Sequence, residues 1–276
     1  MRKTYFAVAI IAAMAIGIAA VPKTMAEKQV KENRSVKIEG ATPENPVVYL
    51  GKAFDKKSGK EVEGYAIVHY ARSAVKPAKP SSSATCYGYL AKGAKWKTIE
   101  DWTVDSENTR GLDGASILQN MSLDISKWED ATDGNITNGT GTNILGAGSL
   151  GVASSTLGIS LDNRNEVEFA SITNTGAIAV TTIWGIFGGP VSSRQLVEWD
   201  QVYDDMDFDW SLSETAVAGK MDFENIATHE LGHSVGMNDL YTSKCSDQTM
   251  YGYASYGEIT KRDLAPGDIT GIDLLY

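Results

Sequence analysis

Cysteine, histidine and proline are scarce in this chain, and basic residues are outnumbered by acidic ones. The 276 residues include two Cys, three His and seven Pro, and 25 Lys and Arg stand against 35 Asp and Glu, for a formal net charge of −10. This acidic excess argues against nucleic acid or an anionic membrane surface as a partner. With 42% hydrophobic and 22% charged residues, the composition excludes a disordered or collagen-like chain and predicts a folded protein with a hydrophobic core.

Long apolar runs are also absent, apart from one at the N-terminus. Arg2 and Lys3 precede an apolar stretch from Tyr5 to Val21. Small residues suited to signal-peptide cleavage after Ala26 follow it. This order is typical of a secretory signal peptide, and the run is at the short end for a bilayer span of about 20 residues. We therefore expect a cleaved signal peptide over residues 1–26, a secreted or cell-surface protein, and no membrane attachment after cleavage. An uncleaved anchor is the alternative.

The two cysteines form the only pair available for a disulfide. Because export leads to an oxidising compartment, we predict a bond between Cys86 and Cys245. Closing so long a loop would stabilise the fold by at most about 5 kcal/mol. The alternative is a free Cys86 that blocks a metal site from an upstream segment.

A linker composition divides the chain in two. Residues 74–84 (AVKPAKPSSSA) are rich in Pro, Ser and Lys. Upstream of them, strand patterns at 47–50 and 65–70 predict a small hairpin. We therefore assign residues 27–80 to an N-terminal segment and linker, a candidate pro-region, and residues 81–276 to one main domain.

The main domain mixes strand and helix patterns. Alternating or continuous β-prone runs indicate strands, and apolar residues at helical spacing indicate helices. A capping side chain is expected at Asp222, a stop at Gly236, and another cap at Asp268. The expected strands are 96–104, 166–171, 177–184 and 196–203, and the expected helices are 116–132, 223–235 and one after residue 267.

The most informative stretch, HELGH, begins at His229 inside the expected helix 223–235. Residues four apart lie on one face of a helix, so the imidazoles of His229 and His233 can reach a single cation. Neutral imidazole suits Zn²⁺ at about 2.0–2.1 Å. Glu230 borders that position, where its carboxylate can accept a proton from an activated water.

A third ligand is expected after the helix. Gly236 can turn the chain back, so Asp239 is the first residue beyond it with a suitable donor. The remaining histidine, His69, lies before the linker and is interpreted as a strand residue of the N-terminal segment. We predict His229, His233 and Asp239 as ligands, with water in the fourth position, as in catalytic rather than structural zinc sites.

The stretch HELGHSVGMND resembles the extended zinc motif H-E-x-x-H-x-x-G-x-x-H of the metzincin clan of metalloproteases. It carries Asp239 in place of the last His, as in a minority of members and in the snapalysin group. Within the clan the chain most resembles the matrixins. The run QTMYG around Met250 is similar to the Met-turn of that family, and residues 268–276 are similar to its closing helix.

This resemblance implies an α+β, zincin-like catalytic domain over residues 81–276. It would contain a twisted mixed five-stranded sheet, an active-site helix, the Met-turn and a C-terminal helix, preceded here by a small β-rich N-terminal segment. The resemblance also implies that substrate lies along an edge strand, for which residues 177–184 are the candidate. A bond from Cys86 to Cys245 would pin the loop that carries the third ligand.

The function implied is a secreted zinc-dependent endopeptidase that hydrolyses protein or peptide substrates, with Glu230 as general base. A zinc-stabilised binding or adhesion module without turnover is the alternative, and Glu230 distinguishes the two because a structural site has no need for it. A third interpretation is a latent zymogen whose residues 27–80 cover the cleft. One acidic run offers oxygen ligands for calcium, but we interpret it as a solvated loop; its members are Asp204, Asp205, Asp207 and Asp209.

Overall fold

The computed structural model describes residues 34–72 and 85–276, with residue 155 left out. The expected signal peptide over residues 1–26 and the linker at 74–84 lie outside the described residues. These two expectations and the domain division drawn from them therefore stay predictions. None of the described helices is long and apolar enough to cross a membrane.

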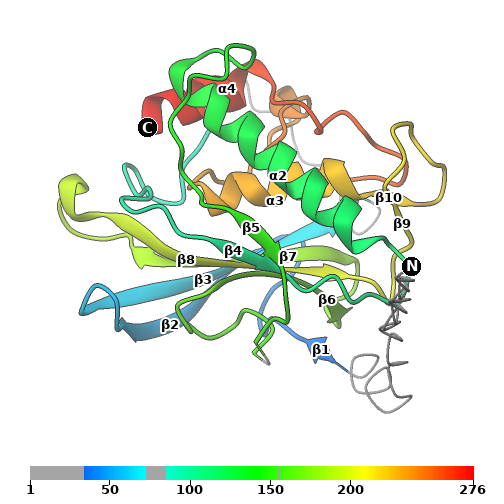
Figure 1. Ribbon diagram of the computed structural model, residues 1–276, viewed down its shortest axis with the longest axis horizontal. Coiled ribbons are helices and arrows are strands. Elements are labelled where there is room, and N and C mark those ends of the chain that lie inside the picture. Colours follow the sequence, from blue (N-terminus) through cyan, green and yellow to red (C-terminus); the bar gives the residue numbers. More distant parts are fainter. Residues whose placement is uncertain (1–33, 73–84, 155) are drawn as a thin grey trace, which may run out of the picture.

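In the part of the chain that the structure describes, a mixed sheet forms one layer and three α-helices form the other (Figure 1). The five central strands are β4 (Trp102–Val104), β5 (Gly148–Leu150), β6 (Asn165–Ile172), β7 (Ala177–Ile186) and β8 (Gln195–Asp204). Their order is β5-β4-β6-β8-β7, and neighbours run parallel except for β7, which is antiparallel to β8. The predicted α+β class and mixed five-stranded sheet are confirmed.

The sheet continues beyond β7 with the predicted N-terminal hairpin, whose strands are β2 (Val47–Asp55) and β3 (Lys60–Ala71). Strand β3 pairs antiparallel with β7, and a short strand β11 (Tyr253–Ala254) pairs parallel with the end of β3. Strand β7 therefore has a neighbour on each side. The expectation that residues 177–184 form an open edge for substrate is wrong in this structure, because β3 already occupies that edge.

Several short elements complete the description. The strands are β1 (Ser35–Val36), β9 (Trp210–Ser211) and β10 (Met221–Asp222), and the 3-10 helices are η2 (Ala131–Asp133), η3 (Val191–Ser193) and η4 (Ser243–Cys245). Strand β1 joins β6, and β9 pairs with β10 in a separate ribbon. The strand expected over 96–104 is shorter than predicted, because its ladder pairing begins only at Trp102.

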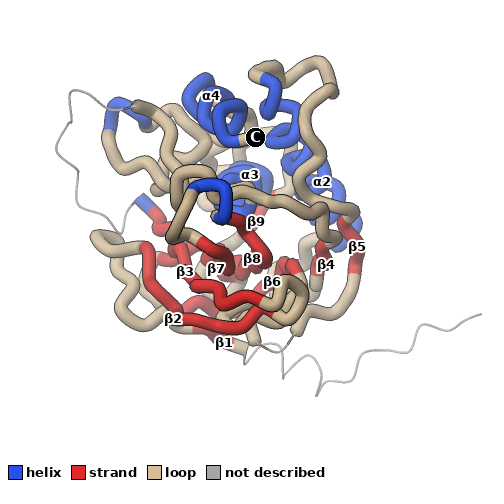
Figure 2. Tube along the Cα trace, turned by 90° about the vertical axis from the view of Figure 1, so that its left-hand side faces the viewer, coloured by secondary structure: helices blue, strands red, loops and turns tan. Residues whose placement is uncertain are grey.

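The helices α2 (Gly114–Asp130), α3 (Phe223–Ser234) and α4 (Pro266–Leu275) lie over one face of the sheet, as Figures 1 and 2 show from two directions. Asp222 caps α3 as predicted, since its side chain accepts a hydrogen bond from the Asn225 amide. The predicted cap of α4 is wrong. Asp268 is the third residue of that helix, and it accepts from the amide of Ala265, the true N-cap residue.

Helix α2 shows how the two layers are held together. Its apolar stripe, spaced by three or four residues, is buried against the core; the members are Ile117, Met121, Ile125 and Trp128. Burying each such side chain contributes about 1.5–3 kcal/mol. The Trp128 indole also donates to the carbonyl of Thr228 on α3 at 2.8 Å. Truncating Trp128 to Ala would cost about 3–5 kcal/mol, because it leaves a cavity between α2 and α3.

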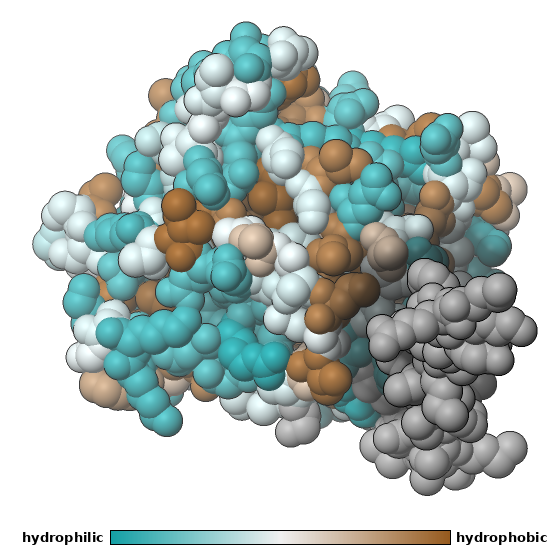
Figure 3. Space-filling view, viewed as in Figure 1, coloured by the Kyte–Doolittle hydropathy of each residue, from teal (hydrophilic) through white to brown (hydrophobic). Residues whose placement is uncertain are grey.

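A disulfide joins Cys86 to Cys245, as predicted, with a Cα–Cα distance of 5.3 Å. It fastens the segment before the first central strand to the turn η4, which follows the residues expected to carry the third ligand. The surface on the side seen in Figure 1 is mixed in character. Figure 3 shows apolar patches where the helical and sheet layers meet, with hydrophilic residues above and below them.

Candidate active site

Three of the predicted site residues converge at the end of α3. His229 and His233 lie one turn apart on one helix face, and Gly236, at φ +106°, reverses the chain and brings Asp239 back. Asp239 Oδ1 lies 3.1 Å from His229 Nε2 and 3.4 Å from His233 Nε2. Two zinc ligands at 2.0–2.1 Å in a tetrahedron are about 3.3 Å apart, so these spacings suit one cation.

The three donor atoms are buried and have no hydrogen-bond partner among the described residues. Within the described part of the chain, His229 Nε2, His233 Nε2 and Asp239 Oδ1 make no hydrogen bond. Leaving buried polar atoms unpaired costs about 1–3 kcal/mol each, so such a cluster is expected only where something else binds them. The geometry fits a metal ion at this point, and the three residues group together as candidate ligands.

The other ring nitrogens orient the imidazoles. His229 Nδ1 donates to the carbonyl of Thr249 at 2.7 Å, and His233 Nδ1 donates to the carbonyl of Met237 at 3.0 Å. Each bond places the proton on Nδ1 and leaves the Nε2 lone pair free for a cation. Asp268 accepts from the amides of Thr249 and Met250, which fixes the loop that positions His229.

Tyr241 orients the third donor, a role that the sequence reasoning missed. Its hydroxyl donates to Asp239 Oδ2, so Oδ1 is left to face the histidines. The ring of Tyr241 packs against that of Tyr253, with centroids 5.3 Å apart. An aromatic residue two positions after the proposed ligand is the only sequence signal for this contact, and it is a weak one.

Met250 lies against the helix turn between the two histidines. A Cβ added at Gly232 would come within 2.2 Å of Met250 Sδ and 2.7 Å of the Trp128 ring. Glycine at position 232 therefore allows Met250 to pack directly under the helix. Met250 is fully buried, and its contact is one of packing against the helix that presents the histidines.

Glu230 lies next to the convergence point and is fully buried. Its Oε2 accepts from the Thr181 hydroxyl on β7 at 2.5 Å, and its Oε1 accepts from His69 Nδ1 at 2.9 Å. Burial raises the pKa of Glu230 to about 7. A carboxylate with a pKa in this range is well matched to proton transfer near neutral pH.

His69 is the least expected member of the site. It is a residue of β3, as predicted, but its side chain points at the helix rather than away from it. Its ring centroid lies 4.0 Å from that of His229, and its Nε2 has no hydrogen-bond partner among the described residues. His69 groups with His229 and Glu230 as a second set of candidate donors. The water expected in the fourth position of the zinc site stays a prediction.

The comparisons with known proteins agree with this geometry. The model of the matrixin family, peptidase M10, matches residues 94–276, well over half of the chain. The chain belongs to the matrixin family. No curated protein matches it. As a matrixin it is a zinc metalloendopeptidase, and the match begins after β2, β3 and His69.

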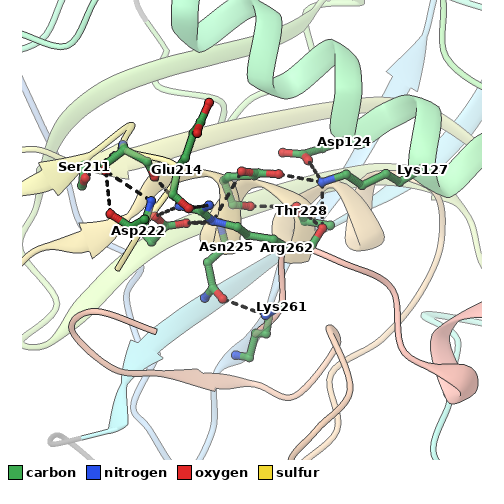
Figure 4. Close-up of polar contacts among 12 residues, drawn as sticks. Asp124, Lys127, Ser211, Glu214, Asp222, Asn225, Thr228, Lys261 and Arg262 are labelled. Carbon is green, nitrogen blue, oxygen red and sulfur yellow. Dashed lines mark hydrogen bonds and ion pairs between the residues drawn. The ribbon is translucent and has the colours of Figure 1, made fainter. Parts of the chain in front are cut away.

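Polar contacts fix the start of α3 in this matrixin (Figure 4). The guanidinium of Arg262 binds the capping carboxylate of Asp222. Lys127 of α2 bridges Asp124 at 2.9 Å and Glu224 of α3 at 2.7 Å. These ion pairs tie α2 and the loop after β11 to the first turn of α3, and so they set the position of the histidines two turns later.

Lys261 holds the segment behind the site. It is 1% exposed, and its ammonium donates to the carbonyls of Tyr251 at 2.6 Å and Tyr253 at 2.7 Å. Burial lowers the pKa of Lys261 to about 8. A buried cation that binds two carbonyls stabilises the turn that leads from Met250 into β11.

The calcium expectation is not supported. Asp204 accepts from the amides of Met206 and Asp207, and Asp205 accepts from the amide of Thr109. Asp209 pairs with Arg110. These carboxylates serve the loop itself, and none of them belongs to a group placed to bind a cation in the described residues.

Proposed function

We propose that this matrixin is a secreted endopeptidase in which His229, His233 and Asp239 hold zinc and Glu230 is the general base. One observation carries the assignment: three buried donor atoms aim at one point without partners, and a carboxylate with a raised pKa lies beside them. The apolar N-terminal run and the disulfide support export. Residues 1–26 would be the signal peptide.

Zinc bound there would acidify the attacking water and polarise the carbonyl of the scissile peptide bond. Glu230 would accept the water proton as the oxygen bonds to the carbonyl carbon. It would then donate that proton to the amide nitrogen as the carbon–nitrogen bond breaks, releasing a carboxylate and an amine. Thr181 would steer the carboxylate through its hydrogen bond to Oε2.

Casein hydrolysis by the wild-type chain and by Glu230→Gln tests the role of Glu230 as general base. We expect Glu230→Gln to retain zinc but to lose about 100-fold or more in kcat/KM, because proton transfer contributes about 10²–10⁴. Glu61→Gln is the control, since it removes an exposed carboxylate that pairs with Lys52 at the surface. Equal hydrolysis by Glu230→Gln and the wild-type chain would refute the proposal.

Glu230→Gln is compared with its parent chain both with His69 intact and in chains that carry His69→Ala, because His69 is hydrogen-bonded to Glu230. A chelator should abolish hydrolysis in every active chain, and added zinc should restore it. A zinc-stabilised module without turnover predicts that Glu230→Gln changes nothing in either background.

A further inference from the structure

A groove lies where three parts of the chain meet: residues 87–97, the turn η3 between β7 and β8, and the last turns of α4. Figure 2 shows the C-terminus on this side, which faces the viewer. The volume of the groove is about 600 Å³, which is within the range of pockets that bind ligands. Neither the proposed ligands nor Glu230 line it, so it is separate from the metal site.

Part of the groove lining is aromatic or aliphatic. The rings of Tyr87 and Tyr89 have their centroids 5.8 Å apart, and the Tyr89 hydroxyl donates to the carbonyl of Gly271 on α4 at 2.9 Å. Two aliphatic lining residues, Val191 of η3 and Leu274 of α4, are 50% and 63% exposed. Exposed apolar side chains that surround a concave surface are typical of a site that receives another apolar group.

The rest of the lining is basic, although the chain as a whole has a net charge of −10. Lys92, Lys95 and Lys97 line the groove, and no acidic side chain lines it among the described residues. Asp273, the neighbour of Leu274, is exposed but lies outside the lining. The Lys95 ammonium binds the main-chain oxygens of residues 275 and 276 at 2.8 and 3.3 Å. The exposed side chains of Lys92 and Lys97 therefore supply the charge that a ligand would meet.

Backbone contacts hold the groove in shape. The Lys97 ammonium donates to the carbonyl of Ser192 at 2.7 Å, and the guanidinium of Arg194 donates to the carbonyl of Lys92 at 2.8 Å. Gly93, at φ +76°, lies so close to η3 that an added Cβ would come within 2.4 Å of a side-chain atom of that turn. These contacts fix residues 92–97 against η3, so a ligand would enter a preformed site and lose little free energy to ordering it.

The groove wall is also joined to the loop that carries the third proposed ligand. Tyr89 forms an antiparallel β-bridge with Met237, and the amide of Asn238 donates to the carbonyl of Gly88 at 3.0 Å. Asn238 is the single residue between Met237 and Asp239. The groove and the proposed zinc site therefore share one short piece of backbone, and a substrate held in the groove is held close to the site.

We propose that this groove is an exosite, a substrate-binding surface outside the place of cleavage, and that it binds an acidic segment of a protein substrate. The lysines would pair with the carboxylates of the segment, and the tyrosines and exposed aliphatic residues would cover an apolar side chain beside them. Charge complementarity selects this occupant, because the acidic chain offers a nucleic acid little basic surface beyond the groove. The inference rests on the proposed function and names a class of substrate for it.

Fluorescence anisotropy measures binding to the groove directly. Full-length, zinc-loaded Glu230→Gln chains are titrated into the fluorescein-labelled peptide EEFLEE, with QQFLQQ as the neutral probe, because the loss of the base leaves both probes uncut. EEFLEE should bind about fivefold or more tightly than QQFLQQ, since it can form several surface ion pairs. This difference should shrink as the salt concentration rises from about 0.05 M to about 0.5 M, because salt screens exposed charges.

Two exposed lining residues locate the binding. Lys92→Glu should weaken EEFLEE by about fivefold or more and leave QQFLQQ unchanged. Leu274→Ser should weaken both peptides by about threefold or more, because the bound probe would cover part of the leucine. Lys220→Glu makes the same charge change at an exposed lysine just before β10, and Leu123→Ser replaces an exposed leucine of α2. Both of these controls should bind the probes like their parent chain.

Hydrolysis by chains with Glu230 intact connects the groove to the site. An internally quenched peptide is compared with the same peptide extended by EEFLEE through a flexible Gly-Ser linker. The extension should lower KM by about fivefold or more, because binding in the groove raises the effective concentration of the peptide at the site. Lys92→Glu should remove this gain and leave kcat/KM for the unextended peptide at the wild-type level, whereas Lys220→Glu should keep the gain.

The outcomes separate this inference from the function beneath it. If Lys92→Glu binds EEFLEE as tightly as Lys220→Glu does, the groove is no exosite and the inference fails while the proposed function stands. If a fluorescein-labelled thymidine oligonucleotide binds as tightly as EEFLEE and depends equally on Lys92, the site accepts any polyanion and the proposed class of substrate is wrong. If EEFLEE binds as expected but no chain hydrolyses a peptide, the proposed function fails and the exosite loses its substrate with it.

Discussion

The metal site and the acidic strands β6 and β8 both bury several ionisable groups, but their polar atoms differ in what they bind. In the acidic strand cluster, which we define as Glu166, Glu168, Glu198 and Asp200, every carboxylate accepts a protein hydrogen bond. In the site, His229 Nε2, His233 Nε2 and Asp239 Oδ1 accept none within the described residues. Buried acid alone therefore does not mark a cation site; what sets the site apart is that three such donor atoms lie within 3.4 Å of a common carboxylate oxygen or are that oxygen.

Removing a site donor should have the largest effect on metal binding. Asp239→Ala takes away one of three proposed ligands, so we expect zinc affinity to fall by more than about 100-fold, a larger loss than for groups that only orient ligands. Competition with a chromogenic chelator measures the affinity. Asp204→Ala removes a carboxylate bound only to amides and should leave zinc affinity unchanged. Equal losses in the two variants would remove the distinction between the regions.

Removing a group that orients a donor should have a smaller effect. Tyr241→Phe deletes the hydroxyl that binds Asp239 Oδ2, and such losses weaken metal binding by about 10–100-fold. Tyr253→Phe is the matched control, because its hydroxyl donates to the carbonyl of Pro43 instead. The same chelator competition measures both variants. Unchanged affinity in Tyr241→Phe would show that Asp239 needs no support to face the histidines.

The acidic strand cluster should make the stability of the fold depend on pH. We expect this effect to be smaller than the effects on zinc affinity. Burial raises the pKa of Glu198 to about 8 and that of Glu168 to about 7. Each folded pKa exceeds the unfolded value, so the stability gained from proton uptake is complete below the unfolded pKa. It is lost as pH rises through about 7–8.

The melting temperatures of metal-free chains, measured as pH rises through about 7–8, test whether stability falls or rises with pH. We expect the wild-type midpoint to fall as pH rises, by about 2–4 °C for each kcal/mol lost. Glu198→Gln cannot ionise and should flatten the slope. Glu61→Gln, which removes an exposed carboxylate, should keep it. A wild-type midpoint that rises with pH in this window would contradict the assignment.

The sequence predicted those parts of the site that depend on local geometry. The four-residue spacing of His229 and His233, the cap at Asp222 and the turn at Gly236 follow from helix periodicity and backbone freedom, and the structure brings Asp239 to the two rings. The five-stranded sheet followed from the family resemblance. These predictions involve residues within one helix and its two ends, or motifs that lie close together.

Contacts between distant segments could not be predicted in this way. His69 reaches Glu230 across 161 residues, and this pairing depends on the register of β3 against β7. The hydrogen bond from Thr181 to Glu230 also joins distant segments. So do the hydrogen bonds from the backbone amides of Thr249 and Met250 to Asp268. A strand pattern gives the alternation of side chains but not the partner strand, so β3 could be predicted as a strand without its place in the sheet.

X-ray absorption at the zinc edge of the loaded full-length chain tests the central claim, that these buried donors share one zinc ion. The account predicts one zinc per chain with only nitrogen and oxygen neighbours at about 2.0–2.1 Å. It also predicts imidazole scattering, and loss of the bound zinc in Asp239→Ala. Sulfur neighbours at about 2.3 Å, or an unchanged zinc shell in Asp239→Ala, would contradict it.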